Sequence, residues 1–268
     1  MRYYNIYYYC NIADNVLYNF NNFIDWASTG AQFTEPFFEE KPENFPKYSA
    51  LHMFCEYTIN QLIYEESERQ LEDVQNDYDS LNISDKKKRL CEAMRNTKTF
   101  DFEIDKIVKY YGKKHKTFFE YLLENDFTYF LDAYNDFRFC NDEIDELIIQ
   151  LSKEMFYVLL QNRTFLFEFN KYLSNSNPYA IRRTNIPSWV KRTVKFRDRG
   201  RCIDCGKDIS GLLDTEEDNS IHFDHIISLK DGGINDVSNI QLMCRECNLK
   251  KSAESYTTSN YYNWYDFE

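Results

Sequence analysis

The chain has 268 residues, of which 43% are hydrophobic and 18% aromatic, enough for two domains with buried cores. Its 7 glycines and 5 prolines exclude a low-complexity chain and argue against a loop-rich all-β fold. No apolar run approaches the ~18–20 residues of a membrane span, and the tyrosine-rich start lacks the layout of a signal peptide. We therefore expect an intracellular, cytoplasmic protein without a membrane partner.

The formal net charge of −12 is unevenly distributed along the chain. Residues 1–180 carry 19 basic and 30 acidic side chains, whereas residues 181–251 carry 13 and 11. Within the second block, residues 182–201 hold eight basic side chains and one acidic one. An acidic region repels a phosphate backbone and a basic run attracts one. The charges predict an acidic N-terminal domain and nucleic-acid contact by the C-terminal part.

Helical spacing of apolar residues dominates the first two thirds of the chain, which predicts a mostly α protein with an N-terminal helical bundle. Residues 3–9 are aromatic enough for a short strand or for the first turn of a helix, and the pattern fits both. The charge run at 85–89 lies near a helix start and is expected to be solvated surface, with nucleic-acid contact as the alternative. The lone histidines His52 and His115 are expected to be structural. Helices are predicted at about 14–26, 48–75, 101–111, 116–125, 129–138 and 142–159.

A domain boundary is predicted where small polar residues precede Pro178, since proline cannot extend the preceding helix. Pro187 then opens a predicted helix with one apolar and one basic side, which ends near Arg199. The predicted organisation is an acidic helical domain at 1–176, a linker at 177–186, a second domain at 187–256 and a tail at 257–268.

The eight cysteines fall into two classes. Four are scattered among apolar neighbours and are expected to be buried, reduced thiols, namely Cys10, Cys55, Cys91 and Cys140. The others form two CxxC pairs, Cys202 with Cys205 and Cys244 with Cys247. Four thiolates suit a closed, tetrahedral Zn²⁺ site, and Gly206 is expected to close the turn of the first pair. The pairs predict a structural zinc site.

An Asp–His pair lies between these cysteine pairs, at the end of a strand predicted from Ser220 to Asp224. A loop at 230–233, a short helix near 236–238 and a last helix from Arg245 to about Glu254 follow. The pair is Asp224–His225, and Asn239 and Asn248 follow it in sequence. This order of residues within a four-cysteine cage resembles the HNH endonuclease family, also called His-Me finger or ββα-metal nucleases. The resemblance covers about residues 187–252.

The resemblance implies a small, treble-clef-like ββα-metal domain that hydrolyses phosphodiester bonds in DNA. It implies that His225 is the general base and that Asn239 braces the loop that orients His225. It also implies that Asp224 and Asn248 are oxygen ligands of a catalytic Mg²⁺ or Mn²⁺, which prefer such ligands. His222 shares a strand face with Asp224. We favour an exposed strand histidine, with a substrate or ligand-supporting contact as the alternative.

Basic residues near the motif are predicted to contact backbone phosphate, although a solvated helix face is the alternative for the run at 182–201. The predicted contacts are Arg192, Lys195, Arg197, Arg199, Arg201, Arg245, Lys250 and Lys251. The favoured function is a nuclease of prokaryotic antiviral defence or of a mobile element, controlled through an N-terminal domain that binds a protein partner or self-associates. The alternative is a zinc-stabilised nucleic-acid-binding module without turnover.

Overall fold

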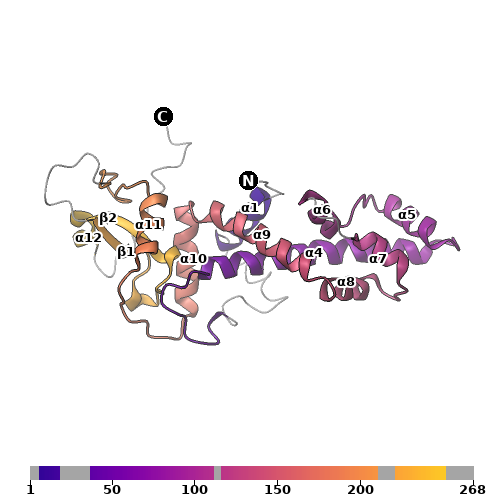
Figure 1. The fold of residues 1–268 in the computed structure, drawn as a ribbon, viewed down its shortest axis with the longest axis horizontal. Coiled ribbons are helices and arrows are strands. Elements are labelled where there is room, and N and C mark those ends of the chain that lie inside the picture. Colours follow the sequence, from indigo (N-terminus) through magenta and orange to yellow (C-terminus); the bar gives the residue numbers. More distant parts are fainter. Residues whose placement is uncertain (1–5, 19–36, 112–115, 211–220, 252–268) are drawn as a thin grey trace. The chain divides into compact units, whose positions relative to one another are not determined.

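The computed structural model describes residues 6–18, 37–111, 116–210 and 221–251, and the statements below concern these ranges (Figure 1). The chain divides into two compact units. Unit 1 comprises residues 1–9 and 55–155, and unit 2 comprises residues 10–54 and 156–268. The described part is mostly helical, with one two-stranded sheet near the C-terminus, as predicted. Among the described helices, none combines the length and apolarity that crossing a membrane requires.

Unit 1 is built from helices around an aromatic core. Phe118 is fully buried, and its ring lies 5.1 Å from that of Phe102 and 5.7 Å from that of Tyr134. Capping fixes the helix starts, as where Thr117 and Glu120 form a reciprocal capping box. The helices of this unit are α5 (Lys86–Asn96), α6 (Glu103–Tyr110), α7 (Phe118–Glu124) and α8 (Phe130–Phe139), with parts of α1 (Ile6–Tyr18), α4 (Ala50–Ser80) and α9 (Asp142–Leu159).

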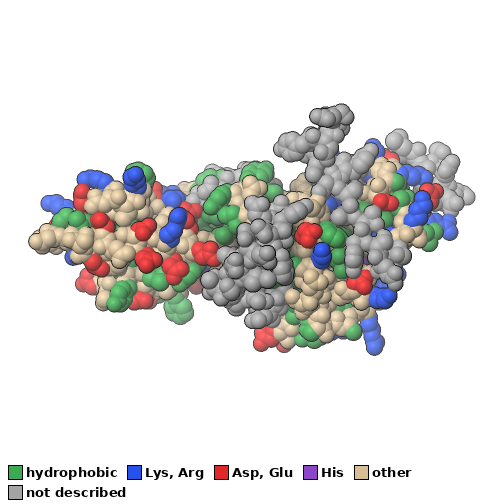
Figure 2. All heavy atoms as spheres, turned by 180° about the vertical axis from the view of Figure 1, so that it is seen from behind, with side chains coloured by type: hydrophobic (Ala, Val, Ile, Leu, Met, Phe, Trp, Pro, Cys, Tyr) green, Lys and Arg blue, Asp and Glu red, His purple; other side chains and the backbone are tan. Residues whose placement is uncertain are grey.

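Acidic side chains gather over the helices of unit 1 on the face drawn in Figure 2. In the charge run, Lys87 and Lys88 are exposed, while Lys86 pairs with Asp126 at 2.9 Å. The Arg89 guanidinium lies 4.1 Å from the centre of the Tyr78 ring. These placements agree with a solvated surface, the interpretation that the sequence favoured.

The predicted helices of unit 1 are all present, with ends shifted by a few residues. Residues 6–9, which the pattern left undecided, are helical in α1. The predicted helix at 14–26 is described only up to Tyr18, and His115 also lies outside the described residues. Cys10 and Cys55 are buried as predicted, but Cys91 and Cys140 are exposed. That part of the prediction is wrong, because apolar sequence neighbours do not place a helical side chain on the buried face.

Unit 2 carries the sheet. Strand β1 (Ile221–His225) pairs antiparallel with β2 (Ile240–Cys244), so that Ile221 lies opposite Cys244 and His225 opposite Ile240. The loop between the strands contains two 3₁₀ turns, η1 (Leu229–Asp231) and η2 (Val237–Asn239). Helices α10 (Arg163–Ser176), α11 (Ser188–Arg197) and α12 (Arg245–Lys250) complete the unit. Val190 and Val194 of α11 are buried in one core with Ile203, Leu242 and three of the paired cysteines, Cys202, Cys244 and Cys247.

Helix α10 was not predicted from the sequence. Asn162 caps its start by accepting a hydrogen bond from the Phe165 amide, and apolar side chains at helical spacing are buried along it. These signals are present in the sequence but lie close behind the long helix α9. His52 is structural, as predicted. Its ring stacks on Phe156 at 3.5 Å between centroids, and its Nδ1 bonds the Ser49 hydroxyl at 2.7 Å.

A buried carboxylate ties α10 and α11 to the sheet. Asp198 is 0% exposed and pairs with Arg197 at 2.8 Å and with Arg163 of α10 at 3.2 Å. It also accepts a hydrogen bond from the Leu242 amide of β2 at 2.9 Å. Arg197 in turn donates to the Ile240 carbonyl at 2.6 Å. Because these charges are buried and paired, removing one partner should be costly.

Candidate functional site

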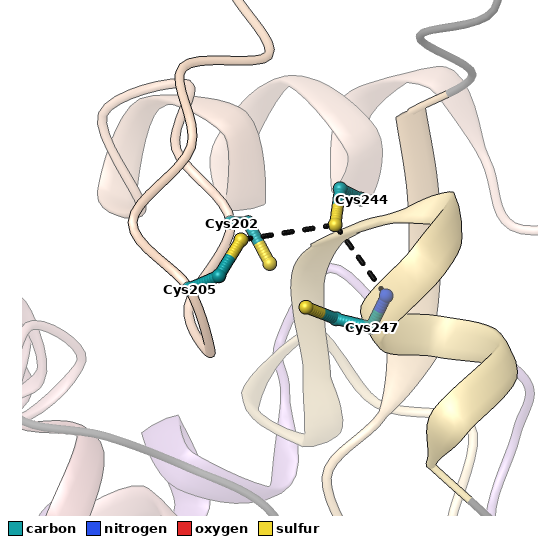
Figure 3. A group of neighbouring side chains, drawn as sticks. All are labelled: Cys202, Cys205, Cys244 and Cys247. Carbon is teal, nitrogen blue, oxygen red and sulfur yellow. Dashed lines mark hydrogen bonds between the residues drawn. The ribbon is translucent and has the colours of Figure 1, made fainter.

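The four paired cysteines converge at one end of the sheet (Figure 3). Cys202 and Cys205 lie on a tight turn in which Gly206, at φ 72°, donates its amide to the Cys202 carbonyl at 2.9 Å. Gly206 therefore closes the turn as predicted. Cys244 ends β2 and caps α12, where its sulfur accepts from the Cys247 amide.

The sulfur positions fit a zinc ion. All four Sγ atoms lie within 4.8 Å of one another, and those of Cys205 and Cys244 are 3.8 Å apart. A regular ZnS₄ tetrahedron with bonds of about 2.3 Å has sulfur–sulfur edges of about 3.8 Å. The cluster of Cys202, Cys205, Cys244 and Cys247 therefore has both the donor chemistry and the spacing of a structural zinc site.

Helix α12 runs back from the cysteines along one face of β1. On that face, the Nδ2 amide of Asn248 lies 3.0 Å from Nδ1 of His222. Two residues further along the strand, Asp224 receives the Lys251 ammonium on Oδ2 at 2.5 Å. Residues i and i+2 of a strand share a face, and residues i and i+3 of a helix are neighbours. Two rungs, His222–Asn248 and Asp224–Lys251, thus join strand and helix.

The contact between His222 and Asn248 contradicts the favoured prediction for His222. It is partly buried and bonded to Asn248, because the strand face that carries Asp224 is the face covered by α12. An exposed strand histidine was therefore the wrong choice. With its Nδ2 committed to His222, Asn248 keeps Oδ1 for another partner.

Asp224 and Asn248 keep two oxygen donors available. Neither Oδ1 of Asp224 nor Oδ1 of Asn248 forms a hydrogen bond with the residues that the structure describes. Both are hard oxygens, the type that Mg²⁺ and Mn²⁺ prefer. The Lys251 ammonium bonds the other oxygen of Asp224 and leaves Oδ1 without a partner among the described residues. The chemistry of these two donors is therefore that of ligands for a hard divalent cation.

His225 is the last residue of β1 and is 8% exposed. Its Nε2 lies 3.0 Å from Oδ1 of Asn235, and no described residue bonds its Nδ1. Burial lowers the pKa of His225 from its ordinary value, and the hydrogen bond to Asn235 opposes that effect. Burial therefore favours the neutral form of the imidazole.

Asn239 closes the loop that follows β1. Its Oδ1 accepts from the Ile227 amide at 2.8 Å, and its Nδ2 donates to the carbonyls of Ile227 and Ile234 at 3.0 and 2.9 Å. The Asn239 carbonyl also accepts from the Ile226 amide at 2.7 Å. Asn239 is 0% exposed, so these bonds connect the two sides of the loop in a dry environment.

The basic residues divide by exposure. Arg192, Arg199, Arg245 and Lys250 are exposed. Arg201 is half-exposed and donates to the Gly206 carbonyl. Lys195 donates to the Ser210 carbonyl at 2.8 Å.

Two of the eight predicted phosphate contacts are engaged elsewhere. The Arg197 side chain is 3% exposed and pairs with Asp198, and that of Lys251 is 7% exposed and bonds Asp224 and the His225 and Ile226 carbonyls. Both positions argue against phosphate contact by these side chains. A basic run in a sequence gives the charge of a segment but not the direction of each side chain.

The loop also depends on residues that sequence reasoning did not single out. Asn170 of α10 donates to the Ser238 carbonyl at 3.1 Å, and Asp236 accepts from the Ala50 amide, at the start of α4, at 2.9 Å. Burial raises the pKa of Asp236. The signals for these residues are weak: an isolated Asn or Asp in a polar stretch is common, and its partner lies far away in sequence.

Residues 202–254 match the HNH endonuclease family. No curated protein and no solved structure matches the chain. The matched segment contains the four cysteines, both rungs, His225 and Asn239.

Proposed function

Since the chain carries an HNH endonuclease domain at residues 202–254, we propose that it is a metal-dependent endonuclease that hydrolyses phosphodiester bonds in DNA. The observation that carries this proposal is the pair of hydrogen-bonded rungs, which sets the Asn248 amide and the Asp224 carboxylate along one face of β1, next in sequence to the imidazole of His225. Binding alone does not require that combination. The zinc turn, the two strands and α12 form a treble-clef-like ββα domain in this proposal.

The proposed mechanism assigns a separate task to each of three side chains. Oδ1 of Asp224 and Oδ1 of Asn248 would hold a Mg²⁺ or Mn²⁺. When bound, such a cation neutralises charge on the phosphate and on the leaving 3′ oxygen. His225 takes a proton from the attacking water through Nδ1, the ring nitrogen that no described residue engages. Asn239 keeps the loop closed so that the His225 ring cannot turn away.

The phosphate backbone is proposed to reach the basic side of α11 as well as α12. Arg192, Lys195 and Arg199 line an open cavity of about 960 Å³, together with the exposed ring of Phe196. None of the described lining residues is acidic. Arg245 and Lys250 are exposed on α12, next to the proposed catalytic groups. Cationic side chains of this kind position a nucleic acid without reading its sequence.

We propose that the acidic helices control this activity through a protein partner or self-association. The predicted division into domains at 1–176 and 187–256 and a role in antiviral defence belong to the same proposal. The second candidate, a zinc-stabilised binding module without turnover, is favoured only by the cysteine cluster, which is equally compatible with both functions.

Plasmid cleavage tests the function. The full-length protein should nick or linearise plasmid DNA in the presence of Mg²⁺ or Mn²⁺. Cleavage should stop when EDTA is added and should recover when Mg²⁺ alone is added back. Recovery without added zinc separates the catalytic ion from the structural one. Asp224→Ala should abolish cleavage while leaving bound zinc unchanged, and Asp126→Ala, at an exposed carboxylate of unit 1, serves as the matched control. DNA binding without any cleavage by the wild type would favour the binding module.

A further inference from the structure

The ring of His225 is held by a chain of two asparagines. Oδ1 of Asn235 lies 3.0 Å from Nε2 of His225. Nδ2 of Asn235 lies 2.7 Å from Oδ1 of Asn44 and 2.8 Å from the Arg182 carbonyl oxygen. Asn235 is 2% exposed, so water does not compete for its amide. Asn44 and Arg182 both lie outside the segment that matches the nuclease family.

The partners of Asn235 determine the orientation of its amide. A backbone carbonyl can only accept a hydrogen bond, so the amide atom beside the Arg182 carbonyl must be the NH₂ group. The atom facing His225 is then the oxygen, which can only accept. Nε2 of His225 must therefore carry the hydrogen. In a neutral imidazole with hydrogen on Nε2, the lone pair lies on Nδ1.

The segment that carries Asn44 is itself fixed to the loop. The Phe45 amide donates to the Asn235 carbonyl at 2.7 Å, and the Phe45 side chain is buried in the core of the sheet. Phe45 adopts φ 55°, in the left-handed region that is unfavourable for a non-glycine residue. Its packing and its hydrogen bond hold it there. Asn44 is thus presented to Asn235 by an anchored backbone, although its own side chain is exposed.

We propose that Asn235 is a positioning residue that locks His225 in the tautomer with hydrogen on Nε2, and that Asn44 and the Arg182 carbonyl hold Asn235 in place. The base role of His225 rests on the proposed function, but the locked tautomer does not. The segment that matches the HNH family then does not contain all of the residues that orient His225. The missing part comes from residue 44 and from the stretch before α11.

Nitrogen NMR of the full-length protein tests the lock without any need for activity. The chain contains 4 histidines, so labelling histidine with ¹⁵N gives few signals, and His225→Ala identifies those of His225. At about pH 8, where imidazoles are neutral, wild-type His225 should show a single tautomer with hydrogen on Nε2. Asn235→Leu should give a mixture or the other tautomer. A wild-type spectrum with hydrogen on Nδ1, or an unchanged spectrum in Asn235→Leu, would overturn the proposal.

Variants of Asn44 separate positioning from stability. Asn44→Asp keeps an oxygen that accepts from Asn235, whereas Asn44→Leu removes it. We expect Asn44→Leu to broaden the tautomer distribution and to lower kcat about tenfold with unchanged KM for DNA, as removal of supporting hydrogen bonds does at other sites. Asn44→Asp should match the wild type in both readouts. Thermal stability should not separate the two variants, because residue 44 is exposed.

These outcomes distinguish two kinds of failure. If the wild type does not cleave DNA but shows the locked tautomer, the proposed function fails and the positioning stands. If the wild type cleaves DNA and Asn44→Leu leaves both kcat and the tautomer unchanged, the role of Asn44 fails and the nuclease stands.

Discussion

At one end of the β1–β2 pair, Ile221 lies opposite Cys244 and the four cysteines gather; at the other, His225 lies opposite Ile240 and the loop to β2 begins. The cysteine end is built from residues 202–247, which are close in sequence. The histidine end depends on distant partners from three other parts of unit 2: Asn44, Ala50, Asn170 and the Arg182 carbonyl.

The difference separates a self-contained anchor from a site that needs external support. A metal ion can hold four thiolates with little help from elsewhere, since metal binding itself stabilises the fold. An imidazole, by contrast, is oriented only by the hydrogen bonds around it. Changes at the cysteine end should therefore alter folding and metal content, whereas changes at the histidine end should alter catalysis before stability.

The largest expected effect on folding follows from the loss of a zinc ligand at the cysteine end. Cys202→Ser should release zinc and unfold the β1–β2 region, because structural zinc contributes about 10 kcal/mol of binding free energy. Metal analysis and circular dichroism would measure both changes. Cys91→Ser, at an exposed thiol of unit 1, is the control and should keep its zinc. If Cys202→Ser kept the zinc content of the wild type, Cys202 would not be a ligand of a structural zinc ion.

Asp198 connects β2 to helices outside the family match, so its removal should weaken both ends together. Asp198→Leu leaves Arg163 and Arg197 without their carboxylate and should lower the unfolding free energy by about 3–5 kcal/mol. Chemical denaturation measures the change. Asp208→Asn removes the charge from the half-exposed pair with Arg201, while its amide oxygen can still accept from Ser210, and should change stability far less. Equal losses of unfolding free energy in the two variants would show that the buried pairs of Asp198 do not stabilise the fold more than an exposed pair does.

Unit 1 provides a reference that involves neither end of the sheet. Asp105 accepts from the Phe118 and Phe119 amides at 2.6 and 3.2 Å, yet burial raises its pKa from 3.8 to about 6. The folded state therefore holds the proton more tightly than the unfolded state. The stabilisation is fully present below the unfolded pKa and is lost as the pH rises to about 6, by about 3 kcal/mol at most.

The Asp105 effect is measured as a difference. Asp105→Asn is neutral at every pH, so the stability of the wild type relative to this variant should fall between about pH 4 and about pH 7. Any acid-induced loss of zinc affects both proteins equally and cancels. A constant difference across this range would show that the buried carboxyl has an ordinary pKa.

The smallest expected effect concerns the loop at the histidine end. Asn170 bonds the Ser238 carbonyl from α10. Asn170→Ala should cost about 1–2 kcal/mol through the lost hydrogen bonds and should lower the cleavage rate. Lys171→Ala, at an exposed position of the same helix, is the control. Hydrogen exchange of the 235–239 amides would detect the loosened loop, and unchanged exchange would count against the support from α10.

The sequence predicted the parts of the site that have local signatures. The CxxC pairs, the Asp–His pair at a strand end and the turn at Gly206 each depend on a few neighbouring residues. The sequence missed α10 and the contacts from Asn44, Asn170 and Asp198, because hydrogen bonds between distant segments leave no periodic pattern in one chain. Lys251 illustrates the same limit. Its charge suggested phosphate, but the fold directs its ammonium to Asp224.

The central claim is that His225 activates the water that cleaves a phosphodiester. Single-turnover cleavage of a labelled DNA duplex in Mg²⁺ tests it most directly, with wild type and His225→Ala compared at matched zinc content. We expect products with 5′-phosphate and 3′-hydroxyl ends, and a rate at least about 100-fold lower in the variant. Equal rates for the two proteins would contradict it.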